Sequence, residues 1–448
     1  MSTPTNRVIS GMRPTGRLHI GHYFGALQNW VKLQSDPNYE CFYFVADWHA
    51  LTSDYADTSA IAENSLQITI DFLASGLDPA KSTIFLQSQV PEHAELHLLL
   101  SMVTPLGWLE RIPTYKEQLD QIKNKDLHTY GFLGYPTLQT ADIVLYSPQA
   151  KSDGTASTSG AAATSASGVG AALGRPSLWV PVGEDQVSHV EFSRELVRRF
   201  NFFYGFEIKE DFLVPANWGD YSAVLKELGV VGTLRDIVDV SPNIEARNAI
   251  KSSMRSRVME MGIDNFFREI GPNGKYFDFK EVLAEPGHLL TPTPRIPGLD
   301  GRKMSKSYNN AITLSESDDD IRKKTKVMVT DPARKRRTDP GNPDICPVYD
   351  WHKLFSTEER DKGRLTWVRQ GCTTAGIGCI ECKSAMAENL IKWIEPVRAR
   401  RLNYEAHPKK ALEILDAGSA KARESAKQTM DRVRNAIFHW PRKRAELQ

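Results

Sequence analysis

The chain lacks several features that would place it in a specialised class of protein. It contains no run of 18 apolar residues and no apolar stretch of a signal peptide at its N-terminus, so we expect a cytoplasmic protein with no membrane partner. Only five cysteines occur in 448 residues, and four of them come late, which does not fit the disulfide framework of a secreted domain. The formal net charge is +1, so overall charge points to no partner.

Strand and helix patterns alternate over the first 90 residues. A short strand at 7–10 leads into the glycine-bearing turn 11–21, and continuous apolar runs at 41–46 and 83–87 are typical of strands covered on both faces. The 3.6-residue period of 59–75 predicts a helix between them. Such a succession predicts an α/β domain with a Rossmann-like parallel sheet and a ligand at its carboxyl edge. No GxGxxG follows the first strand, which argues against a dinucleotide.

The length allows two or three domains. We expect a catalytic domain over residues 1–310 and an all-α domain over 311–448, because helical patterns fill 383–400 and 408–437. Ser315 is expected to cap a helix with an acidic first turn.

Two inserts interrupt the catalytic domain. Residues 148–177 are rich in Ser, Ala, Gly and Thr, and they have almost no large apolar side chain with which to build a core, so we expect a flexible insert. Residues 206–275 carry apolar side chains of their own and are expected to form a small folded insertion.

Two short motifs predict a site for the triphosphate of ATP. In His19-Ile20-Gly21-His22, the glycine lets backbone approach a phosphate, and the histidines offer donors at the start of a helix expected at 23–34. Some 280 residues later, Lys303-Met304-Ser305-Lys306-Ser307 adds two ammonium groups on a loop. Either motif alone is weak evidence for such a site, since HxGH also occurs in small adenylyltransferases. Both in this order predict a nucleotide held from two sides.

The late cysteines form a candidate metal site. Cys346, Cys372, Cys379 and Cys382 have the spacing C-x25-C-x6-C-x2-C, and four thiolates with a closing CxxC suit Zn²⁺ or a [4Fe–4S] cluster. A zinc ribbon usually has two CxxC pairs and this chain has one. Unligated buried cysteines are the alternative. Cys41, within an apolar strand, is expected to be structural.

The two motifs resemble those of class I aminoacyl-tRNA synthetases. Gly11-Met12-Arg13-Pro14-Thr15-Gly16, Tyr135-Pro136, Ala141-Asp142 and the run from Val180 to Gln186 extend the resemblance to bacterial tryptophanyl-tRNA synthetases, over nearly the whole chain apart from the inserts. The resemblance implies activation of L-tryptophan by ATP, transfer to tRNA(Trp) and a homodimer. The segment 331–347 with the late cysteines resembles the subset that carries a [4Fe–4S] cluster in the anticodon-binding region.

The resemblance also implies roles for single residues. Asp142 would accept the indole N–H, and Tyr135, Gln139 and Gln186 would complete the tryptophan site. His19, His22, Lys303 and Lys306 would be catalytic, with Mg²⁺ shared by the phosphate oxygens. The residues expected to border ATP are Arg13, Pro14, Thr15, Gly21, His22, Gly183, Glu184, Asp185, Ile296, Lys303, Met304, Ser305, Lys306 and Ser307.

Three other functions fit part of the pattern. Tyr135, Gln139 and Asp142 also resemble the substrate helix of tyrosyl-tRNA synthetases. A small HxGH adenylyltransferase would need neither the cysteines nor the basic end of the chain, where residues 396–448 hold 13 Lys or Arg against 6 Asp or Glu. A catalytically silent RNA-binding relative would be expected to lack a motif lysine or Asp142, and all are present. The basic runs, 334–337 included, suit a phosphate backbone.

Overall fold

The computed structural model describes residues 6–112, 115, 127–148, 177–209, 244–291 and 296–447. The first predicted insert, 148–177, lies outside the described residues except for its two end positions. Residues 210–243 of the second predicted insert also lie outside them.

A five-stranded parallel sheet forms the centre of the N-terminal region. Its strands are β1 (Asn6–Met12), β2 (Tyr39–Val45), β3 (Ser82–Leu86), β4 (Ser177–Val182) and β7 (Pro286–Leu290). Their order is β3-β2-β1-β4-β7, and every neighbouring pair is parallel. The predicted Rossmann-like α/β fold is therefore confirmed, and β7 is an edge strand that the sequence pattern did not reveal.

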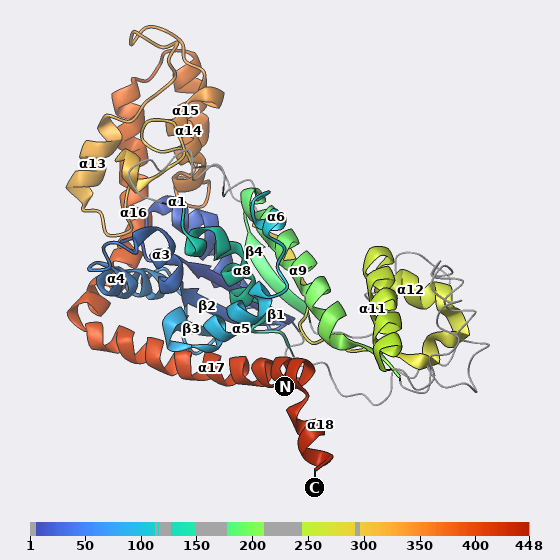
Figure 1. Cartoon of the computed structure of the whole chain (residues 1–448). Coiled ribbons are helices and arrows are strands. Elements are labelled where there is room, and N and C mark those ends of the chain that lie inside the picture. The colour runs from blue at the N-terminus through green and yellow to red at the C-terminus, as the bar shows by residue number, and fades with distance from the viewer. Residues whose placement is uncertain are drawn as a thin grey trace.

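Helices cover both faces of this sheet (Figure 1). Along β2, Cys41, Tyr43 and Val45 pack into one hydrophobic cluster, and Phe42 and Phe44 pack into a second cluster on the other face. A strand buried on both sides must be apolar throughout, which explains the continuous run read from the sequence. The helices of this region are α1 (Ile20–His22), α2 (Gln28–Leu33), α3 (Asp47–Asp54), α4 (Ile61–Ala74), α5 (Glu92–Ser101), α6 (Leu106–Leu109), α8 (Tyr130–Val144) and α9 (Val187–Gly205).

Two helices differ from their predicted form. The first begins at Ile20 and contains a π-helical turn over Tyr23–Leu27 before continuing as α2, so the helix predicted at 23–34 is present with an irregular start. The helical pattern of the sequence starts at Leu138, whereas helix α8 begins eight positions earlier, at Tyr130, and continues through Pro136. A proline in a helical pattern normally ends the helix, so the sequence favoured a later start.

The described parts of the second insert pack around their own apolar side chains. Strands β5 (Phe206–Ile208) and β6 (Phe277–Phe279) pair in antiparallel fashion beside α11 (Ile244–Met261) and α12 (Ile263–Ile270). Their shared cluster is built from Phe206, Met254, Val258, Phe266 and Phe277, among others. This unit projects from the end of α9 in Figure 1.

The C-terminal region is helical, as predicted. It comprises α13 (Asp318–Lys326), α14 (Pro347–Phe355), α15 (Arg364–Thr373), α16 (Cys379–Ala406), α17 (Pro408–Phe438) and α18 (Trp440–Ala445). The expected cap at Ser315 was wrong by two positions, because Ser317 Oγ accepts the N–H of Asp320 at 3.1 Å. Glu316 instead folds back and accepts the N–H of Thr313 at 3.0 Å, which leaves it before the helix.

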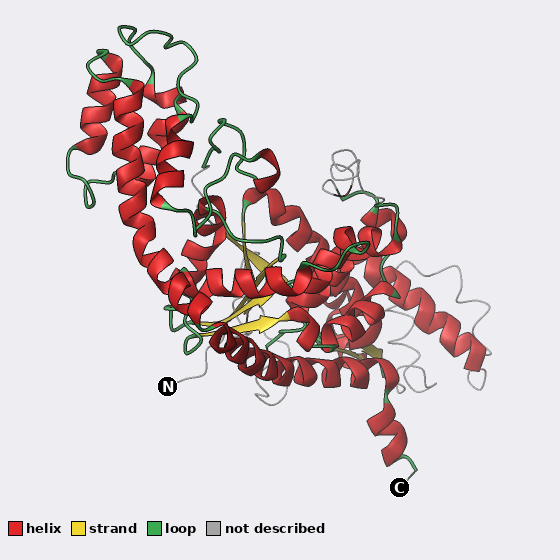
Figure 2. Ribbon diagram, turned by 90° about the vertical axis from the view of Figure 1, so that its left-hand side faces the viewer, coloured by secondary structure: helices red, strands yellow, loops and turns green. Residues whose placement is uncertain are grey.

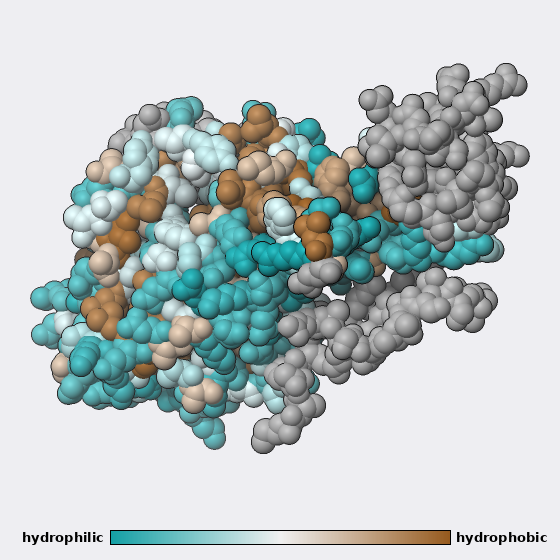
Figure 3. All heavy atoms as spheres, turned by 60° about the horizontal axis from the view of Figure 1, so that its bottom comes forward, coloured by the Kyte–Doolittle hydropathy of each residue, from teal (hydrophilic) through white to brown (hydrophobic). Residues whose placement is uncertain are grey.

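Helix α17 runs back along the N-terminal region and covers the edge of the sheet (Figures 1 and 2). A Cβ at Gly418 would lie 1.8 Å from the carbonyl oxygen of Ile84 in β3, so only glycine permits this approach. Ser419 Oγ accepts the N–H of Leu86 at 3.1 Å, which satisfies part of the edge strand. The face that α17 crosses is mainly hydrophilic, with apolar residues in separate patches (Figure 3).

Candidate active site

A cleft of about 1620 Å³ opens at the carboxyl ends of β1 and β4. The strand order reverses between these two strands, which is where open parallel sheets bind their ligands. The cleft wall includes Gly11 at the end of β1, where a Cβ would lie 2.5 Å from the ring of Phe44. Gly11 therefore lets an aromatic ring pack directly beneath the cleft.

The HxGH turn holds its two histidines in fixed and neutral forms. The His19 backbone N–H donates to His22 Nδ1 at 3.2 Å, so a neutral His22 carries its proton on Nε2. The two rings lie 3.6 Å apart between centroids. Burial, followed by the charge of Lys306, lowers the pKa of His19 to about 4, and burial lowers the pKa of His22 well below its usual value. Both side chains are thus uncharged donors at neutral pH.

The two motifs meet at Gly21. A Cβ there would lie 2.9 Å from the His19 ring and 3.4 Å from the sulfur of Met304, so glycine makes room for the second motif against the first. Backbone bonds join the same regions: Ile20 N–H donates to Ile312 O at 3.0 Å, and His19 pairs with Thr313. The segment that follows the second motif therefore lies against the start of the first helix.

A buried amide holds the second motif in place. Asn310 Oδ1 accepts the N–H of Ser305 at 2.7 Å, and its Nδ2 donates to Lys303 O at 3.1 Å and to Asp300 Oδ1 at 2.7 Å. Lys306 Nζ donates to the carbonyl of Thr15 at 2.8 Å, which brings this ammonium group to the loop before HxGH. The charge of Lys306 therefore lies beside the histidine pair, in agreement with its effect on their pKa values.

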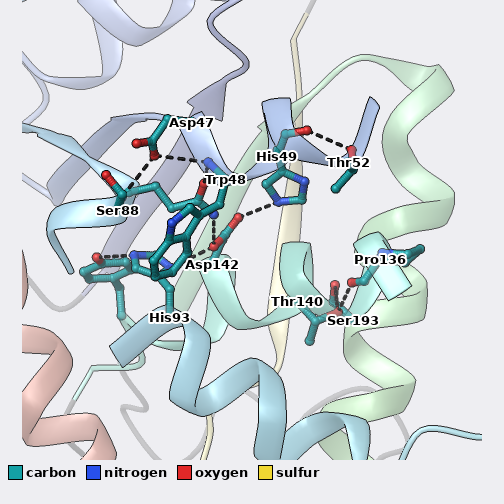
Figure 4. Close-up of polar contacts among 12 residues, drawn as sticks. Asp47, Trp48, His49, Thr52, Ser88, His93, Pro136, Thr140, Asp142 and Ser193 are labelled. Atoms are coloured by element: carbon teal, nitrogen blue, oxygen red, sulfur yellow. Dashed lines mark hydrogen bonds and ion pairs between the residues drawn. The ribbon is translucent and has the colours of Figure 1, made fainter. Parts of the chain in front are cut away.

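Asp142 lies at the other end of the cleft inside a hydrogen-bond network (Figure 4). Its Oδ1 accepts from Gln87 Nε2 and from His93 Nδ1, each at 2.7 Å, and its Oδ2 accepts from His49 Nε2 at 2.8 Å. Burial alone would raise the pKa of Asp142, but the hydrogen bonds from His49 and His93 lower it to about 2. The cleft thus contains a buried carboxylate that stays ionised.

A second layer of this network fixes the imidazole of His93. His93 Nε2 lies 2.9 Å from the hydroxyl of Tyr146, and burial raises the pKa of that phenol well above its usual range. Since a carboxylate only accepts, His93 Nδ1 carries the proton that it donates to Asp142. In the neutral imidazole Nε2 then accepts the Tyr146 hydroxyl proton, so the chain of donors runs from Tyr146 through His93 to Asp142.

Four supporting residues were not predicted from the sequence: His49, Gln87, His93 and Asn310. A usable signal existed for two of them, because Gln87 directly follows β3 and His49 comes shortly after β2, at the edge where parallel strands present their ligands. His93 and Asn310 act by supporting other residues, and single positions in a helix or loop give no such signal.

The cleft gathers most of the predicted site residues. Those that line it are Arg13, His19, Gly21, His22, Tyr135, Gln139, Asp142, Gly183, Glu184, Gln186, Ile296, Lys303 and Met304. Of the remaining predicted positions, Pro14, Thr15, Ser305 and Lys306 neighbour this set in the sequence but do not line the cleft. The side chains of Asp185 and Ser307 lie outside the part of the chain that the structure describes.

Comparison with known proteins identifies the family. Residues 1–226 and 258–395 match the family of tRNA synthetases class I (W and Y), which groups the tryptophan and tyrosine enzymes. The tryptophan–tRNA ligase of Ralstonia nicotianae is 43% identical over 96% of this chain and 98% of that protein, and the one from Thermotoga maritima is 39% identical over the same shares. The chain belongs to the tryptophan–tRNA ligases. This membership excludes the tyrosyl and small adenylyltransferase alternatives.

A solved structure of this family supports the same assignment. The tryptophanyl-tRNA synthetase of Campylobacter jejuni, complexed with ADP and tryptophan, is 26% identical and superposes with a TM-score of 0.65. The match covers 96% of this chain and 99% of that one. Within the described residues, no helix is long and apolar enough to cross a membrane.

In this family member, the four late cysteines are near one another and none forms a disulfide. Burial, followed by the negative charges of Cys346, Cys372 and Cys379, raises the pKa of Cys382 to about 12. The described part of the chain contains no group of three His, Cys, Asp or Glu side chains that would hold a single metal ion.

Two arginines of the basic run 334–337 face the cysteine region. Arg334 is buried and donates to Ile377 O at 2.7 Å, and its Nη1 lies 3.8 Å from Cys372 Sγ. Arg337 donates to Ala375 O at 2.6 Å. Only Lys335 and Arg336 of this run stay fully available to an external phosphate, so half of the predicted basic patch has an internal role.

Proposed function

We propose that the cleft activates L-tryptophan with ATP and then transfers the amino acid to tRNA(Trp). The observation that carries this proposal is the ionised carboxylate of Asp142 at one end of a cleft whose other end holds both phosphate-binding motifs. Indole has one N–H donor and no acceptor, so a buried carboxylate that cannot become a donor is a suitable partner.

The network leaves one position on Asp142 for the substrate. Oδ1 already accepts two hydrogen bonds and Oδ2 accepts one, while each carboxylate oxygen has two lone pairs. We therefore assign the indole N–H to Oδ2, beside His49. Tyr135, Gln139 and Gln186 also line the cleft and complete the proposed tryptophan site. Phenylalanine would leave the Oδ2 position unpaired, and a site built on such a bond discriminates strongly.

At the other end, the proposed chemistry is an in-line displacement. The tryptophan carboxylate attacks the α-phosphorus, a new C–O–P bond forms, and the bond to the β-phosphate oxygen breaks to release pyrophosphate. No general base is needed because the nucleophile is already ionised. His19, His22 and the Gly21 backbone are assigned to the α-phosphate, and Lys303 and Lys306 to the β- and γ-phosphates, where they stabilise leaving-group charge. Mg²⁺ bound with ATP would share that charge.

The residues between these ends are assigned to the nucleotide and the amino acid. Gly183 and Glu184 line the cleft after β4 and are proposed to face the ribose together with Asp185. The remaining proposed ATP contacts are Arg13, Pro14, Thr15, Ile296, Met304, Ser305 and Ser307.

The second step needs the helical region. We propose that residues 1–310 form the catalytic domain and that 311–448 bind the anticodon part of tRNA(Trp), while the 2′-OH of the terminal ribose attacks the adenylate carbonyl and AMP leaves. Exposed cations such as Lys335 and Arg336 suit the phosphate backbone. An enzyme with this substrate works in the cytoplasm.

A tryptophan-dependent ATP–pyrophosphate exchange assay tests the proposal. We expect exchange with tryptophan and background exchange with tyrosine at equal concentration. Exchange with tyrosine, or exchange that does not depend on an amino acid, would contradict the assignment of Asp142.

We further propose that Cys346, Cys372, Cys379 and Cys382 hold a [4Fe–4S] cluster. Three observations support the fit: all four thiols are free, they lie within electrostatic range of one another, and Arg334 places a cation beside Cys372. A Cβ at Gly341 would lie 2.7 Å from Cys372 Sγ, so glycine leaves room at this thiol.

Anaerobic purification tests the cluster. We expect a brown protein with broad absorption near roughly 400 nm, as thiolate-ligated clusters show. Cys379→Ser should remove the colour and reduce tRNA charging more than adenylate formation, because the cysteines belong to the helical region. Cys41→Ser is the matched control, since Cys41 lies in the core of β2. Metal analysis that finds one zinc per chain, without iron or sulfide, would change the proposed metal to zinc and leave the four proposed ligands unchanged.

We also propose a homodimer through an apolar surface on α5, α6 and α8. Leu98, Met102, Leu106 and Tyr130 are each more than half exposed there, and α8 packs against both other helices. Four large apolar side chains on adjoining elements are typical of a protein interface. Sedimentation should give a dimer that Met102→Glu weakens, whereas a monomeric wild type would refute the interface.

A further inference from the structure

A buried ion pair joins the helical region to the catalytic region. Asp71 of α4 and Arg401 of α16 are 0% and 1% exposed and are 330 positions apart in the sequence. Arg401 Nη1 donates to Asp71 Oδ1, and Arg401 Nη2 donates to Gln67 Oε1, one turn earlier on α4. Nothing in the proposed chemistry uses either residue.

The second oxygen of Asp71 holds the loop before HxGH. Asp71 Oδ2 accepts the backbone N–H of Leu18 at 2.6 Å, and Leu18 immediately precedes His19. The carbonyl of Leu18 accepts the N–H of Leu314, so this peptide lies between Asp71 and the segment after the second motif. Asp71 also acts electrostatically on Lys306. Burial lowers the pKa of Lys306, and the negative charge of Asp71 offsets part of that shift. The carboxylate of Asp71 therefore supports the point where the two motifs meet.

Helix α16 connects this point with the cysteine site. Its first residue is Cys379, and near its other end Arg401 binds Asp71 and Gln67 of α4. Figure 1 shows α16 running from the helical region down to α4. On the same helix, Arg398 donates to the carbonyl of Glu316 at 2.9 Å, and the side chain of Glu316 binds Thr313, the partner of His19. One helix thus contacts the supports of both motifs.

We propose that Asp71 and Arg401 are positioning residues for ATP: Arg401 fixes the carboxylate of Asp71, and Asp71 fixes the Leu18 peptide and with it the HxGH turn. This inference rests on the proposed ATP role of that turn. It assigns to a residue of the helical region a part in nucleotide binding, without contact with the nucleotide.

A purely structural ion pair would behave differently. Buried ion pairs can often be replaced by apolar residues of similar volume with no loss of stability, whereas removal of one partner leaves an uncompensated charge. If the ion pair only fills space, an apolar replacement restores both the fold and the kinetics with ATP. If Asp71 positions Leu18, the apolar replacement restores the fold but leaves the Leu18 N–H without its acceptor.

The experiment compares two double variants by ATP–pyrophosphate exchange, with rates normalised to active sites. Asp71→Leu with Arg401→Met removes the acceptor, and Asp71→Asn with Arg401→Gln keeps an oxygen for Leu18. We expect the first to lower kcat/KM for ATP by about ten- to a hundredfold, as small displacements at reacting groups do, with the Kd for tryptophan within about twofold. The second should recover most of this loss.

Arg400→Met is the matched control, because Arg400 ties the same helix to α4 through Ala74 O at 2.6 Å without touching Leu18. An Asp71→Leu/Arg401→Met variant that matches this control in kcat/KM for ATP would overturn the proposal, as would equal losses for ATP and tryptophan in that variant. If the Asp71→Leu/Arg401→Met variant fails to fold, Arg401→Lys is used in its place. This variant should raise KM for ATP by about threefold, whereas the control should leave KM for ATP unchanged. His19→Asn is measured in parallel: unchanged ATP kinetics there would refute the role of the HxGH turn itself.

Discussion

The two ends of the cleft are built in different ways. At the tryptophan end, Asp142 is 2% exposed, and donors from three other segments, His49, Gln87 and His93, fix both of its oxygens. At the ATP end, the groups come from two loops, and Lys303 is exposed while Lys306 is half-buried. In the proposed function, selectivity for indole would depend on a rigid buried charge. The charge of the leaving pyrophosphate would be met by two lysines that the solvent reaches, although His19 beside them is only 6% exposed.

This difference suits the demands of the two substrates. Discrimination between amino acids needs a polar group that is costly to leave unpaired, and burial supplies that cost. Pyrophosphate must leave after each turnover, so a site that bound it as rigidly would slow release. The comparison predicts large effects on amino acid choice from changes at one end, and effects on rate from changes at the other.

Asp142→Asn should give the largest effect. The amide keeps the volume but brings two N–H groups against His49, Gln87 and His93, and it weakens the acceptor for indole. We expect kcat/KM for tryptophan to fall by roughly 10³-fold, with ATP binding nearly unchanged. ATP–pyrophosphate exchange measures kcat/KM for tryptophan, and equilibrium binding of an ATP analogue measures the affinity for the nucleotide. The control is Asp416→Asn, an exposed α17 acid that accepts from Gln89 and does not line the cleft. A loss below tenfold would show that Asp142 is not the main determinant.

Lys306→Ala should give the next largest effect, and on rate instead of binding. Lys306 would meet pyrophosphate charge mainly in the transition state, so its loss should cost roughly 2–4 kcal/mol in adenylate formation. Tryptophan binding should stay close to wild type. Rapid-quench measurement of adenylate formation tests this, with the exposed Lys323→Ala as the control. A rate within threefold of wild type would contradict the role of Lys306.

These two residues also show how far the sequence could be interpreted. Lys306 and Asp142 were found because each belongs to a motif with a recognisable spacing, and the parallel sheet followed from its apolar strands. The supports of those residues were not found. His93, Asn310 and Asp71 act through contacts that depend on how distant segments pack, and Arg401 reaches Asp71 across 330 positions. A periodic pattern reports the burial of a side chain but not the atom that it meets.

A smaller effect is expected from pH on the histidine pair. The pKa of His19 falls from 6.5 to about 4 on folding, so below pH 6.5 the unfolded chain binds a proton that the folded chain does not. This contribution to stability is complete above pH 6.5 and is lost as the pH falls toward 4. His19→Asn should therefore lose about 2 kcal/mol less than wild type between pH 7.5 and pH 5.

Urea unfolding at the two pH values measures this difference. The exposed His407→Asn is the control and should follow wild type. If His19→Asn and wild type lost equal stability, His19 would be protonated in the folded protein, and the phosphate end of the cleft would carry more charge than the structure indicates.

The smallest effect is expected from deletion of residues 150–174, which lie outside the described residues. Their composition offers almost no large apolar side chain, so they cannot add a core to either end of the cleft. The flanking elements, α8 with Asp142 and β4 leading to Gly183, already pack against the sheet and against α9. The shortened protein should form adenylate within about twofold of wild type, since long surface insertions cost little to close. Insolubility or loss of exchange would show instead that the insert packs against the tryptophan end, and that Asp142 depends on it.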